Sequence, residues 1–329
     1  MTLIAGLLEA FFTERLHHQR AASPNTVAAY RDTFRLLLVF AQQRLRKPPS
    51  ALPLADLDAA FVVAFLHHLE KQRGNSVRTR NARLAAIHSF FRFVALQEPA
   101  LSATCQRVLA IPTKKAERKL ITSLDRAEQE ALLAALDRKT WLGRRDHAII
   151  VLLIQTGLRV SELRDLRRED VVLSTGAHVR CRGKGRKERC TPLTRDTVAV
   201  LKAWLAERAG LPTDPVFPSR RGAVLSRDAV ERLVTKYAEV AATTCPSLRA
   251  KRVTPHVLRH TTAVSLLQAG NDRAVIALWL GHESIETTQM YLDADLTMKE
   301  RALAKTAPLR TGPARFRPDD NLLAFLSGL

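Results

Sequence analysis

A mainly α-helical fold with two domains and one small antiparallel β-sheet is predicted from three features of the sequence. The chain has 329 residues, enough for about two domains of ordinary size. Through the first hundred residues, apolar side chains recur at steps of three and four, the period of an amphipathic helix. Only residues 171–193 contain short strand-like runs separated by glycine-containing turns. We therefore expect a helical bundle followed by a larger, mainly helical domain that holds the sheet.

The helices of the first domain can be located from their start signals and apolar patterns. Ser23 followed by Pro24 is typical of an N-cap and a first helical turn. Further amphipathic stretches cover residues 57–69 and 76–96. A basic helix face is often only solvated surface, but it can also contact an anionic partner. The candidates here are Arg78, Arg80 and Arg83.

A polar, charged segment interrupted by Pro112 separates the two predicted domains. Such composition is typical of a linker, which we place at residues 106–120. The first domain then covers residues 1–105 and the second covers residues 121–308. A closing tail, residues 309–329, begins as a loose connector and ends in a short helical pattern.

The second domain is expected to begin with a capped helix near residues 122–125. A buried helix over residues 146–158 should end near Gly157, and helices should resume from residue 194 to about residue 305. The strands are expected at residues 171–173, 178–182 and 189–193. A tight basic hairpin loop joins the last two strands and carries Lys184, Arg186 and Lys187.

The charge balance points to a polyanionic partner. Lys and Arg number 52 against 32 Asp and Glu, a net charge of +20. Arginines are spread along the whole chain rather than gathered on one amphipathic segment, which favours nucleic acid over a membrane surface. The longest apolar run, residues 148–154, is far shorter than the roughly 20 residues needed to span a bilayer. We expect a cytoplasmic protein that does not bind membranes.

The four cysteines show no metal-binding spacing. They are scattered and form no CxxC pair, as suits a reducing compartment. His256 and His260 are four residues apart and could ligate a metal as a pair, but no third ligand is obvious. We therefore expect no metal and no cofactor.

Several residues of the second half supply what phosphodiester transfer without a metal requires. Fixed cations must meet the negative charge that develops on the phosphate, and guanidinium groups do this with a planar fork. A tyrosine nucleophile, with an ordinary pKa of about 10, needs a base or a strongly cationic pocket, and the leaving oxygen needs a proton. The candidates are Arg159, Lys184, His256, Arg259, His282 and Tyr291.

Local spacing supports grouping these residues. His256 and Arg259 are three apart and share a helix face, in a helix that starts at Thr254 and Pro255. Tyr291, nine residues beyond His282, lies in a polar segment. The chain has two other tyrosines, on helix patterns that make them core or boundary residues: Tyr30 and Tyr237. Taken alone, Tyr291 would be interpreted as a packing or surface residue. The cationic residues of the neighbouring motifs make it the candidate nucleophile.

These motifs resemble the catalytic signature of the tyrosine recombinase (phage integrase) family, including its Xer-type members. The signature comprises Thr-Gly-Leu-Arg-x-Ser-Glu-Leu at residues 156–163, a hairpin lysine, His-x-x-Arg at 256–259, Leu-Gly-His at 280–282 and a tyrosine nine residues later. The resemblance covers essentially the whole chain. It implies an N-terminal core-binding, SAM-like helical bundle and a C-terminal catalytic domain.

The resemblance also implies a role for each matching residue. Arg159 and Arg259 would clamp the scissile phosphate, to which His282 would donate a hydrogen bond. Lys184 would protonate the leaving 5′ oxygen, and His256, oriented by Glu162, would help accept the tyrosine proton. Tyr291 would form a 3′-phosphotyrosyl link that preserves the bond energy, so rejoining would need neither ATP nor a metal.

The implied partners are double-stranded DNA and other recombinase protomers, in a homo-tetramer or a hetero-tetramer with a related recombinase. The tail at residues 309–329 is expected to insert into a neighbouring protomer; the alternative is that it docks on its own domain or frays. Two other functions remain open at this point. They are DNA relaxation by a type IB topoisomerase and DNA-binding regulation without catalysis.

Overall fold

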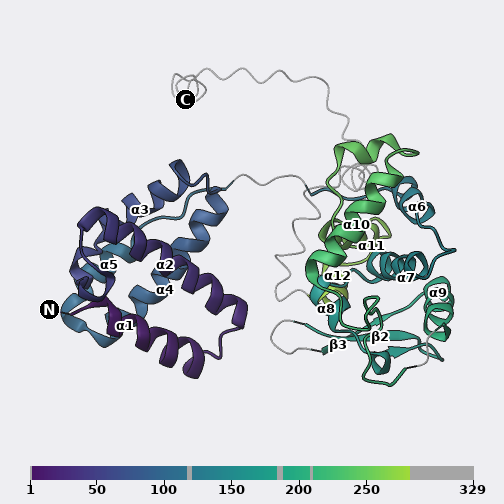
Figure 1. Cartoon of the computed structure of the whole chain (residues 1–329), viewed down its shortest axis with the longest axis horizontal. Coiled ribbons are helices and arrows are strands. Elements are labelled where there is room, and N and C mark those ends of the chain that lie inside the picture. Colours follow the sequence, from purple (N-terminus) through teal and green to yellow (C-terminus); the bar gives the residue numbers. More distant parts are fainter. Residues whose placement is uncertain (1, 117–120, 184–187, 208–209, 282–329) are drawn as a thin grey trace, which may run out of the picture. The chain divides into compact units, whose positions relative to one another are not determined.

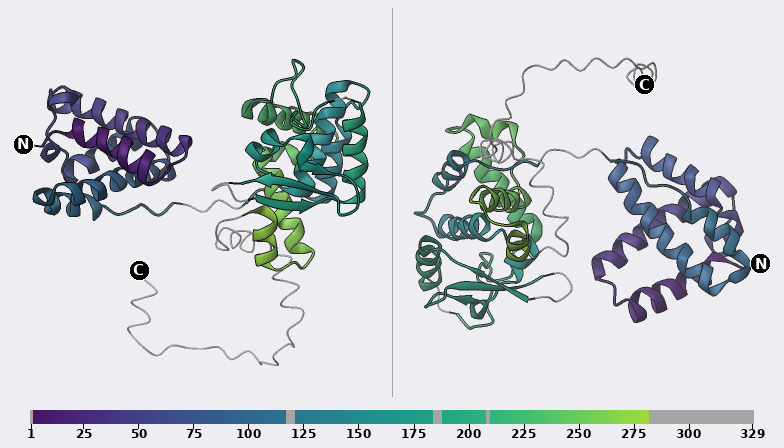
Figure 2. Two further views of the ribbon diagram at one scale, coloured as in Figure 1. Left: turned by 90° about the horizontal axis from the view of Figure 1, so that it is seen from below. Right: turned by 180° about the vertical axis from the view of Figure 1, so that it is seen from behind.

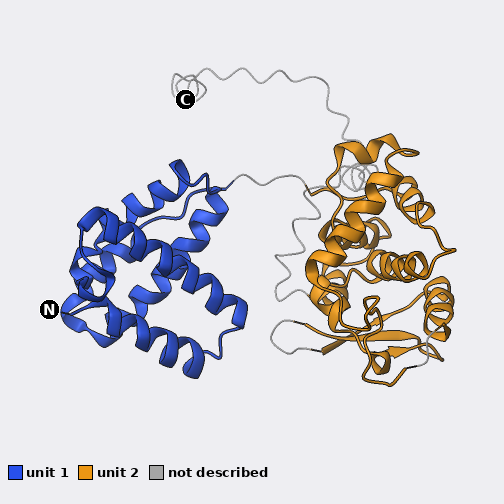
Figure 3. Cartoon of the chain, in the orientation of Figure 1, with its two compact units in different colours: residues 1–118 blue, residues 119–329 orange. Residues whose placement is uncertain are grey.

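The computed structural model describes residues 2–116, 121–183, 188–207 and 210–281 (Figure 1). The chain divides into two compact units, residues 1–118 and residues 119–329, which Figure 3 distinguishes by colour. Each unit has its own buried apolar core.

Unit 1 is helical throughout its described part. Its first turns combine an α-helix with a π-helical continuation, and short 3-10 turns connect the later helices. Its elements are α1 (Ile4–Ala10), η1 (Phe11–Gln19), α2 (Pro24–Leu45), η2 (Pro49–Ala51), η3 (Leu54–Asp56), α3 (Ala59–Lys71), α4 (Val77–Gln97), η4 (Pro99–Leu101) and α5 (Ser102–Leu109).

Side-chain caps start the three long helices of unit 1. The hydroxyl of Ser23 accepts a hydrogen bond from the Thr26 N–H, which confirms the predicted start of α2. Asp58 and Ser76 cap α3 and α4 in the same way. Each cap satisfies a backbone donor that has no partner inside its helix.

Aromatic rings fill the centre of unit 1. The Phe90 ring centroid lies 5.5 Å from that of Phe11 and 5.1 Å from that of Phe34, with the rings edge to face. These three side chains come from α4, η1 and α2, and each is at most 3% exposed. The burial of these large apolar surfaces holds the three elements together.

Helix α5 lies where the sequence predicts the start of the linker. Residues 106–109 are its last turn, and the buried side chains of Cys105 and Val108 join the core of unit 1. Ile111 is buried there too. The domain boundary at residue 105 is therefore too early, because apolar contacts carry the first unit beyond it.

Unit 2 is also mainly helical and contains the predicted sheet. Its helices, with the 3-10 turns η5 (Arg168–Asp170) and η7 (Pro246–Ala250), are α6 (Arg126–Ala134), α7 (Trp141–Thr156), α8 (Val160–Asp165), α9 (Arg195–Ala206), α10 (Arg227–Ala241), α11 (Pro255–Gln268) and α12 (Arg273–Leu280). Its strands are β1 (Val171–Val172), β2 (His178–Arg182) and β3 (Glu188–Pro192).

The three strands form an antiparallel sheet in the order β1-β2-β3. Cys181 of β2 pairs with Arg189 of β3, so their side chains point to the same face of the sheet. The sheet lies at one end of unit 2, away from α6 (Figures 1 and 2). The hairpin itself is confirmed, while its loop residues 184–187 lie outside the described residues.

Helix α7 forms the centre of the unit 2 core and packs against α9 and α11. It begins at Trp141, earlier than the predicted residue 146, because the Thr140 hydroxyl accepts a hydrogen bond from the Gly143 N–H. A Cβ atom at Gly143 would lie 1.8 Å from the Asp137 carbonyl oxygen, so only glycine fits at this start. The helix ends at Thr156, which places Gly157 at the predicted terminus.

Candidate active site

Arg159 follows the turn that joins α7 to α8. Gly157 stands in this turn in the left-handed conformation, with φ of 63°. A Cβ atom at Gly157 would come within 2.6 Å of Leu280 Cδ2, so glycine allows the ends of α7 and α12 to approach each other. Arg159 stands at the N-cap of α8, and its side chain remains 33% exposed.

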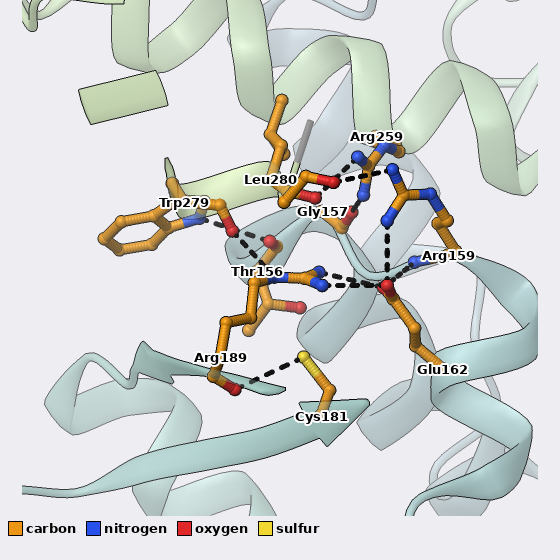
Figure 4. Close-up of polar contacts among 10 residues, drawn as sticks. Thr156, Gly157, Arg159, Glu162, Cys181, Arg189, Arg259, Trp279 and Leu280 are labelled. Atoms are coloured by element: carbon orange, nitrogen blue, oxygen red, sulfur yellow. Dashed lines mark hydrogen bonds and ion pairs between the residues drawn. The ribbon is translucent and has the colours of Figure 1, made fainter. Parts of the chain in front are cut away.

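Arg259 reaches the same place from α11. The Thr254 hydroxyl accepts a hydrogen bond from the Val257 N–H and starts this helix, as the sequence predicts. The Arg259 side chain is almost fully buried, at 3% exposure. Its Nη1 donates to the Gly157 carbonyl at 2.6 Å, and its Nη2 donates to the Leu280 carbonyl at 2.7 Å (Figure 4). Arg259 therefore joins the ends of α7 and α12.

Glu162 places a buried carboxylate between two arginines. Its side chain is 2% exposed. Arg159 donates to it from the backbone N–H at 2.8 Å and from Nη1 at 2.9 Å. Arg189 binds it with a two-pronged contact, Nη1 to Oε1 and Nη2 to Oε2, both at 2.8 Å (Figure 4). This geometry is the strong, planar form of an arginine–carboxylate pair.

The arginines keep Glu162 ionised. Burial by itself raises the pKa of Glu162, but hydrogen bonding and positive charge from Arg189, with the contacts from Arg159, outweigh it and hold the pKa below its usual value. The carboxylate is therefore a fixed negative charge at neutral pH, and it holds both guanidinium groups in place.

Arg189 is a residue of this site that the sequence reasoning missed. Besides binding Glu162, its Nε donates to the Trp279 carbonyl at 3.0 Å, so it links β3 with α8 and α12. Strand alternation offered a signal, because Arg189 lies opposite Cys181 on the buried face of the sheet. A charged side chain on such a face requires a buried partner.

The C-terminus of α12 is surrounded by guanidinium groups. The last carbonyls of a helix lack partners within the helix and carry partial negative charge, which cations stabilise. Consecutive carbonyls accept as follows: Trp279 from Arg189 Nε at 3.0 Å, Leu280 from Arg259 Nη2 at 2.7 Å, and Gly281 from Arg159 Nη2 at 2.9 Å. His282 is the next residue in the sequence.

His256 and His260 lie beside the arginines on α11. Their ring centroids are 4.2 Å apart, edge to face. Desolvation, with the positive charges of Arg259 and Arg159, lowers the pKa of His256, which remains exposed to solvent. His260 is 9% exposed, and burial with the nearby His256 and Arg259 lowers its pKa to about 4. A neutral His256 can accept a proton at neutral pH.

The structure corrects the expected role of Glu162. Both of its oxygens face the guanidinium groups of Arg159 and Arg189, and no hydrogen bond joins it to His256 among the described residues. In the same ranges, no group of three or more His, Cys, Asp or Glu side chains could hold a metal ion.

Arg159, Arg189 and Arg259 form an arginine cluster, which can bind an anion at the edge where Arg159 is exposed. The terminal nitrogens of Arg159 each carry two hydrogens, and each donates one hydrogen bond to the described protein. With a third of the side chain exposed, the remaining N–H groups can meet a phosphate from solvent. His256 supplies a neighbouring group that can exchange a proton.

Three of the predicted catalytic residues lie outside the described residues: Lys184, His282 and Tyr291. The other two tyrosines are packing residues, as predicted. Tyr30 stacks on Phe11 with 6.2 Å between ring centroids. Tyr237 is 6% exposed and donates to Asp146 Oδ2 at 3.2 Å, and burial with the Asp146 charge raises its pKa to about 12.

The three candidate DNA contacts of α4 have different surroundings. Arg78 is exposed. Arg83 is half-buried and donates to the Ala29 carbonyl and to the Thr33 hydroxyl. Arg80 is only 5% exposed and donates to the Pro112 carbonyl at 3.0 Å, so its charge is used inside unit 1. Its burial corrects the expectation that Arg80 contacts DNA. Arg186 and Lys187 lie outside the described residues.

The chain belongs to the phage integrase family of tyrosine recombinases. A family model described as "Phage integrase family" matches residues 122–298, and one described as "Phage integrase, N-terminal SAM-like domain" matches residues 10–98. The arginine cluster and the sheet lie within the first match. The protein is therefore a site-specific DNA recombinase, and the topoisomerase and regulator alternatives have no support.

Similar curated proteins carry matching names. The putative integrase/recombinase y4rC of Sinorhizobium fredii is 58% identical over 326 residues, which are 99% of this chain and 98% of the relative. Tyrosine recombinase XerC of Pelobacter propionicus is 34% identical over 311 residues, covering 93% of this chain and 98% of that protein.

Solved structures of recombinases share the fold. XerH site-specific recombinase bound to palindromic difH substrate matches with a TM-score of 0.68 and 23% identity, over 87% of this chain and 81% of that chain. The Tn1549 transposon integrase in complex with circular intermediate DNA matches with a TM-score of 0.69 and 18% identity, over 93% and 100%. At these identities the matches show the fold alone.

Among the described residues, no helix is long and apolar enough to cross a membrane.

Proposed function

We propose that Tyr291 cleaves DNA by attacking a phosphodiester and forming a 3′-phosphotyrosyl link, and that the reverse reaction rejoins strands without a metal or ATP. The observation that carries the proposal is the convergence of Arg159 and Arg259 on the end of α12, one residue before His282 in the sequence. Two fixed guanidinium groups are what a phosphate transition state needs.

The remaining roles follow from the chemistry of each group. His256, with its lowered pKa, accepts the proton of Tyr291 as the phenol attacks. His282 donates a hydrogen bond to the phosphate, and Lys184 gives a proton to the leaving 5′ oxygen. The Tyr291–phosphate bond replaces the broken P–O bond one for one, so the 5′ hydroxyl of another strand can reverse the step. Glu162 acts indirectly, by holding Arg159.

Double-stranded DNA is the proposed substrate and main partner. The net charge of +20 supports this, as do the DNA complexes in which XerH and the Tn1549 integrase were solved. Arg78 and Arg83 are proposed backbone contacts in unit 1, and Arg186 and Lys187 are proposed contacts near the hairpin. Affinity should therefore fall steeply with salt.

Assembly and biological setting complete the proposal. Two rounds of cleavage and exchange require four protomers, so we place the chain in a homo-tetramer or a hetero-tetramer with a related recombinase on DNA. The tail at residues 309–329 would insert into a neighbouring protomer; unchanged synapsis by a chain truncated at Pro308 would contradict this. We place the reaction in the cytoplasm and favour integration, excision or transposition of a mobile element over chromosome-dimer resolution, in line with the name integrase/recombinase of the 58% identical relative.

Trapping the covalent intermediate tests the proposed chemistry. The full chain first selects its binding site from random duplexes, and that site is then synthesised with a nick beside the scissile phosphate. The nicked duplex should yield a denaturation-resistant protein–DNA adduct in the presence of a chelator. Tyr291→Phe should abolish the adduct, and Tyr237→Phe should retain it. An adduct that survives Tyr291→Phe, or no adduct on the selected site, would refute the proposal.

A further inference from the structure

We infer that Arg189 is a positioning residue for strand cleavage, which acts through Glu162 and the end of α12 to hold Arg159 and the chain that enters His282. This inference rests on the proposed function and adds a residue to it. Arg189 was not among the residues that the signature motifs identify.

The guanidinium of Arg189 is engaged inside the protein. Its side chain is 11% exposed. Nη1 and Nη2 bind the two oxygens of Glu162, and Nε binds the Trp279 carbonyl (Figure 4). All three nitrogens therefore have protein acceptors on two other elements. Arg189 fixes the distance between β3, α8 and the end of α12.

Only an arginine has the shape for these contacts. Its planar fork matches both carboxylate oxygens, while Nε donates to a third acceptor; a lysine offers one point charge. The fit is also close on the α12 side. A Cβ atom at Gly281, where φ is 64°, would lie 2.8 Å from Arg189 Nη1. The chain thus turns out of α12 directly over the guanidinium.

Loss of Arg189 would change the ionisation of Glu162. The buried carboxylate would keep only the contacts from Arg159, and burial, which raises the pKa of Glu162, would no longer be outweighed. A protonated Glu162 holds Arg159 less firmly. The titratable and charged groups around it are Arg159 of α8, Arg189 of β3, Cys181 of β2 and, through Arg159, Arg259 and His256 of α11.

Arg189 also anchors the hairpin. It is the second residue of β3, directly after the loop that contains Lys184 in the sequence. At this end of the hairpin, Arg182 and Glu188 also form an ion pair, and their side chains are 72% and 53% exposed. An exposed pair of this kind contributes little rigidity. The buried contacts of Arg189 are therefore the stronger tie between the hairpin and the arginine cluster.

The first measurement is the rate of adduct formation on the nicked site under single-turnover conditions, as a function of pH. Full-length Arg189→Met should cleave about 100-fold more slowly, because a displaced Arg159 misaligns the phosphate. In the pH–rate profile of Arg189→Met, the fall in rate on the acidic side (the acidic limb) should begin at a higher pH than in the wild type, because Glu162 takes up a proton more readily. Arg189→Lys should restore part of the rate.

Two further variants separate positioning from a general structural effect. Arg189→Met combined with Glu162→Gln leaves no unpaired buried charge, so it should fold even if the single variant does not. It should lack the shifted acidic limb, which excludes His256 as its source. Arg180→Met is the matched control, because Arg180 lies on β2, is 50% exposed and pairs only with Asp170 at 3.3 Å among the described residues. It should cleave within about twofold of the wild type.

A second measurement needs no DNA and no catalysis. The chain has three tryptophans, so labelling with 5-fluorotryptophan gives three fluorine resonances, and Trp279→Phe assigns the one beside Arg189. In Arg189→Met this resonance should shift with pH as Glu162 titrates, and the added Glu162→Gln should remove the shift.

The outcomes distinguish this inference from the proposed function. An Arg189→Met rate profile parallel to that of the wild type, with an unchanged Trp279 resonance, would overturn the positioning role. A wild-type protein that forms no Tyr291-dependent adduct would refute the proposed function instead. In that case the Trp279 titration still decides whether Arg189 controls the ionisation of Glu162.

Discussion

The interiors of the two units are built differently. In the described part of unit 1 the core is aromatic and aliphatic, and its buried polar residues are Thr33 and Arg80. Unit 2 buries carboxylates and guanidinium groups as well, among them Glu128, Arg145, Asp146, Glu162 and Arg259. Buried charge is costly unless it is fully paired. Unit 1 is therefore stabilised mainly by apolar packing, while unit 2 also buries paired charges, some of them at the candidate active site and others elsewhere in its core.

Within unit 2, the number of converging guanidinium groups distinguishes the candidate active site from the other buried ion pairs. Arg145 binds Asp146 with both side chains 9% exposed, and Tyr237 completes a closed network. Glu128 is bound by Ser247 and by Lys251, which is 29% exposed. The cluster around Glu162 differs in the number of its cations, because Arg159 and Arg189 bind the same carboxylate and Arg259 reaches the same end of α12. Several guanidinium groups held together, with Arg159 33% exposed, are what a phosphate site requires.

The largest expected effect is on the packing of unit 1. Phe90→Ala removes a fully buried ring that contacts Phe11 and Phe34, and should lower the free energy of unfolding of unit 1 by about 3–5 kcal/mol. Denaturant unfolding of the full chain, followed by hydrogen exchange in each unit, measures this. The control Leu96→Ala, at a side chain 73% exposed, should change it by less than about 0.5 kcal/mol. Equal losses would show that the aromatic core is not what holds unit 1.

A smaller effect, on rate rather than packing, is expected at Arg259. Arg259→Lys keeps a positive charge but cannot bind Gly157, Leu280 and a phosphate together, so adduct formation should fall by about 100- to 1,000-fold. Quenched-flow or gel assays on the nicked site measure the rate. Arg227→Lys, at an exposed pair with Glu231, should leave the rate unchanged. A wild-type rate in Arg259→Lys would remove this residue from the phosphate clamp.

Mild acid should destabilise unit 2 more than unit 1. Burial lowers the pKa of His260 to about 4, so the unfolded chain takes up a proton first as the pH falls. The contribution of neutral His260 to the free energy of unfolding of unit 2 is complete above about pH 6.5. This contribution should be lost, by up to about 3 kcal/mol, as the pH drops towards 4. His88 of unit 1 shows a shift in the same direction and should contribute less.

Hydrogen exchange at a series of pH values resolves the two units separately. In His260→Gln the acid sensitivity of unit 2 should flatten, with unit 1 unaffected. Equal acid sensitivity in both units of the wild type would contradict the contrast between their interiors.

The smallest effect concerns a tyrosine that serves structure. Tyr237→Phe removes the hydrogen bond to Asp146, which Arg145 continues to bind, and should cost about 1 kcal/mol of unfolding free energy. Adduct formation should be unchanged. A loss of the adduct in this variant, with the fold intact by circular dichroism, would implicate Tyr237 in catalysis.

Much of the fold was predictable because its signals are local. Ser23 and Gly157 mark helix ends through capping and left-handed geometry, and the hairpin follows from alternation between turns. Helix α5 was missed because it is short and buries only Cys105 and Val108, too few positions for a clear period.

The predicted site residues came from motifs, and the structure adds how they are held. Arg159 and Arg259 are brought together at the end of α12. Arg159 donates to the Gly281 carbonyl, 122 residues away in the sequence, and Arg259 donates to the Leu280 carbonyl, 21 residues away. Arg189 could not be assigned, because its partners Glu162 and Trp279 lie 27 and 90 residues away. Pairings at such separations depend on the tertiary fold, which no local pattern encodes.

The chemical identity of the trapped adduct tests the central claim most directly. After nuclease and protease digestion of the adduct, mass spectrometry should find a nucleotide linked through its 3′ phosphate to the peptide that contains Tyr291, and the same peptide should be modified, more slowly, in Arg189→Met. A nucleotide on Tyr30, on Tyr237 or on a serine, or an unmodified Tyr291 peptide in a protein that has cleaved its site, would contradict the account.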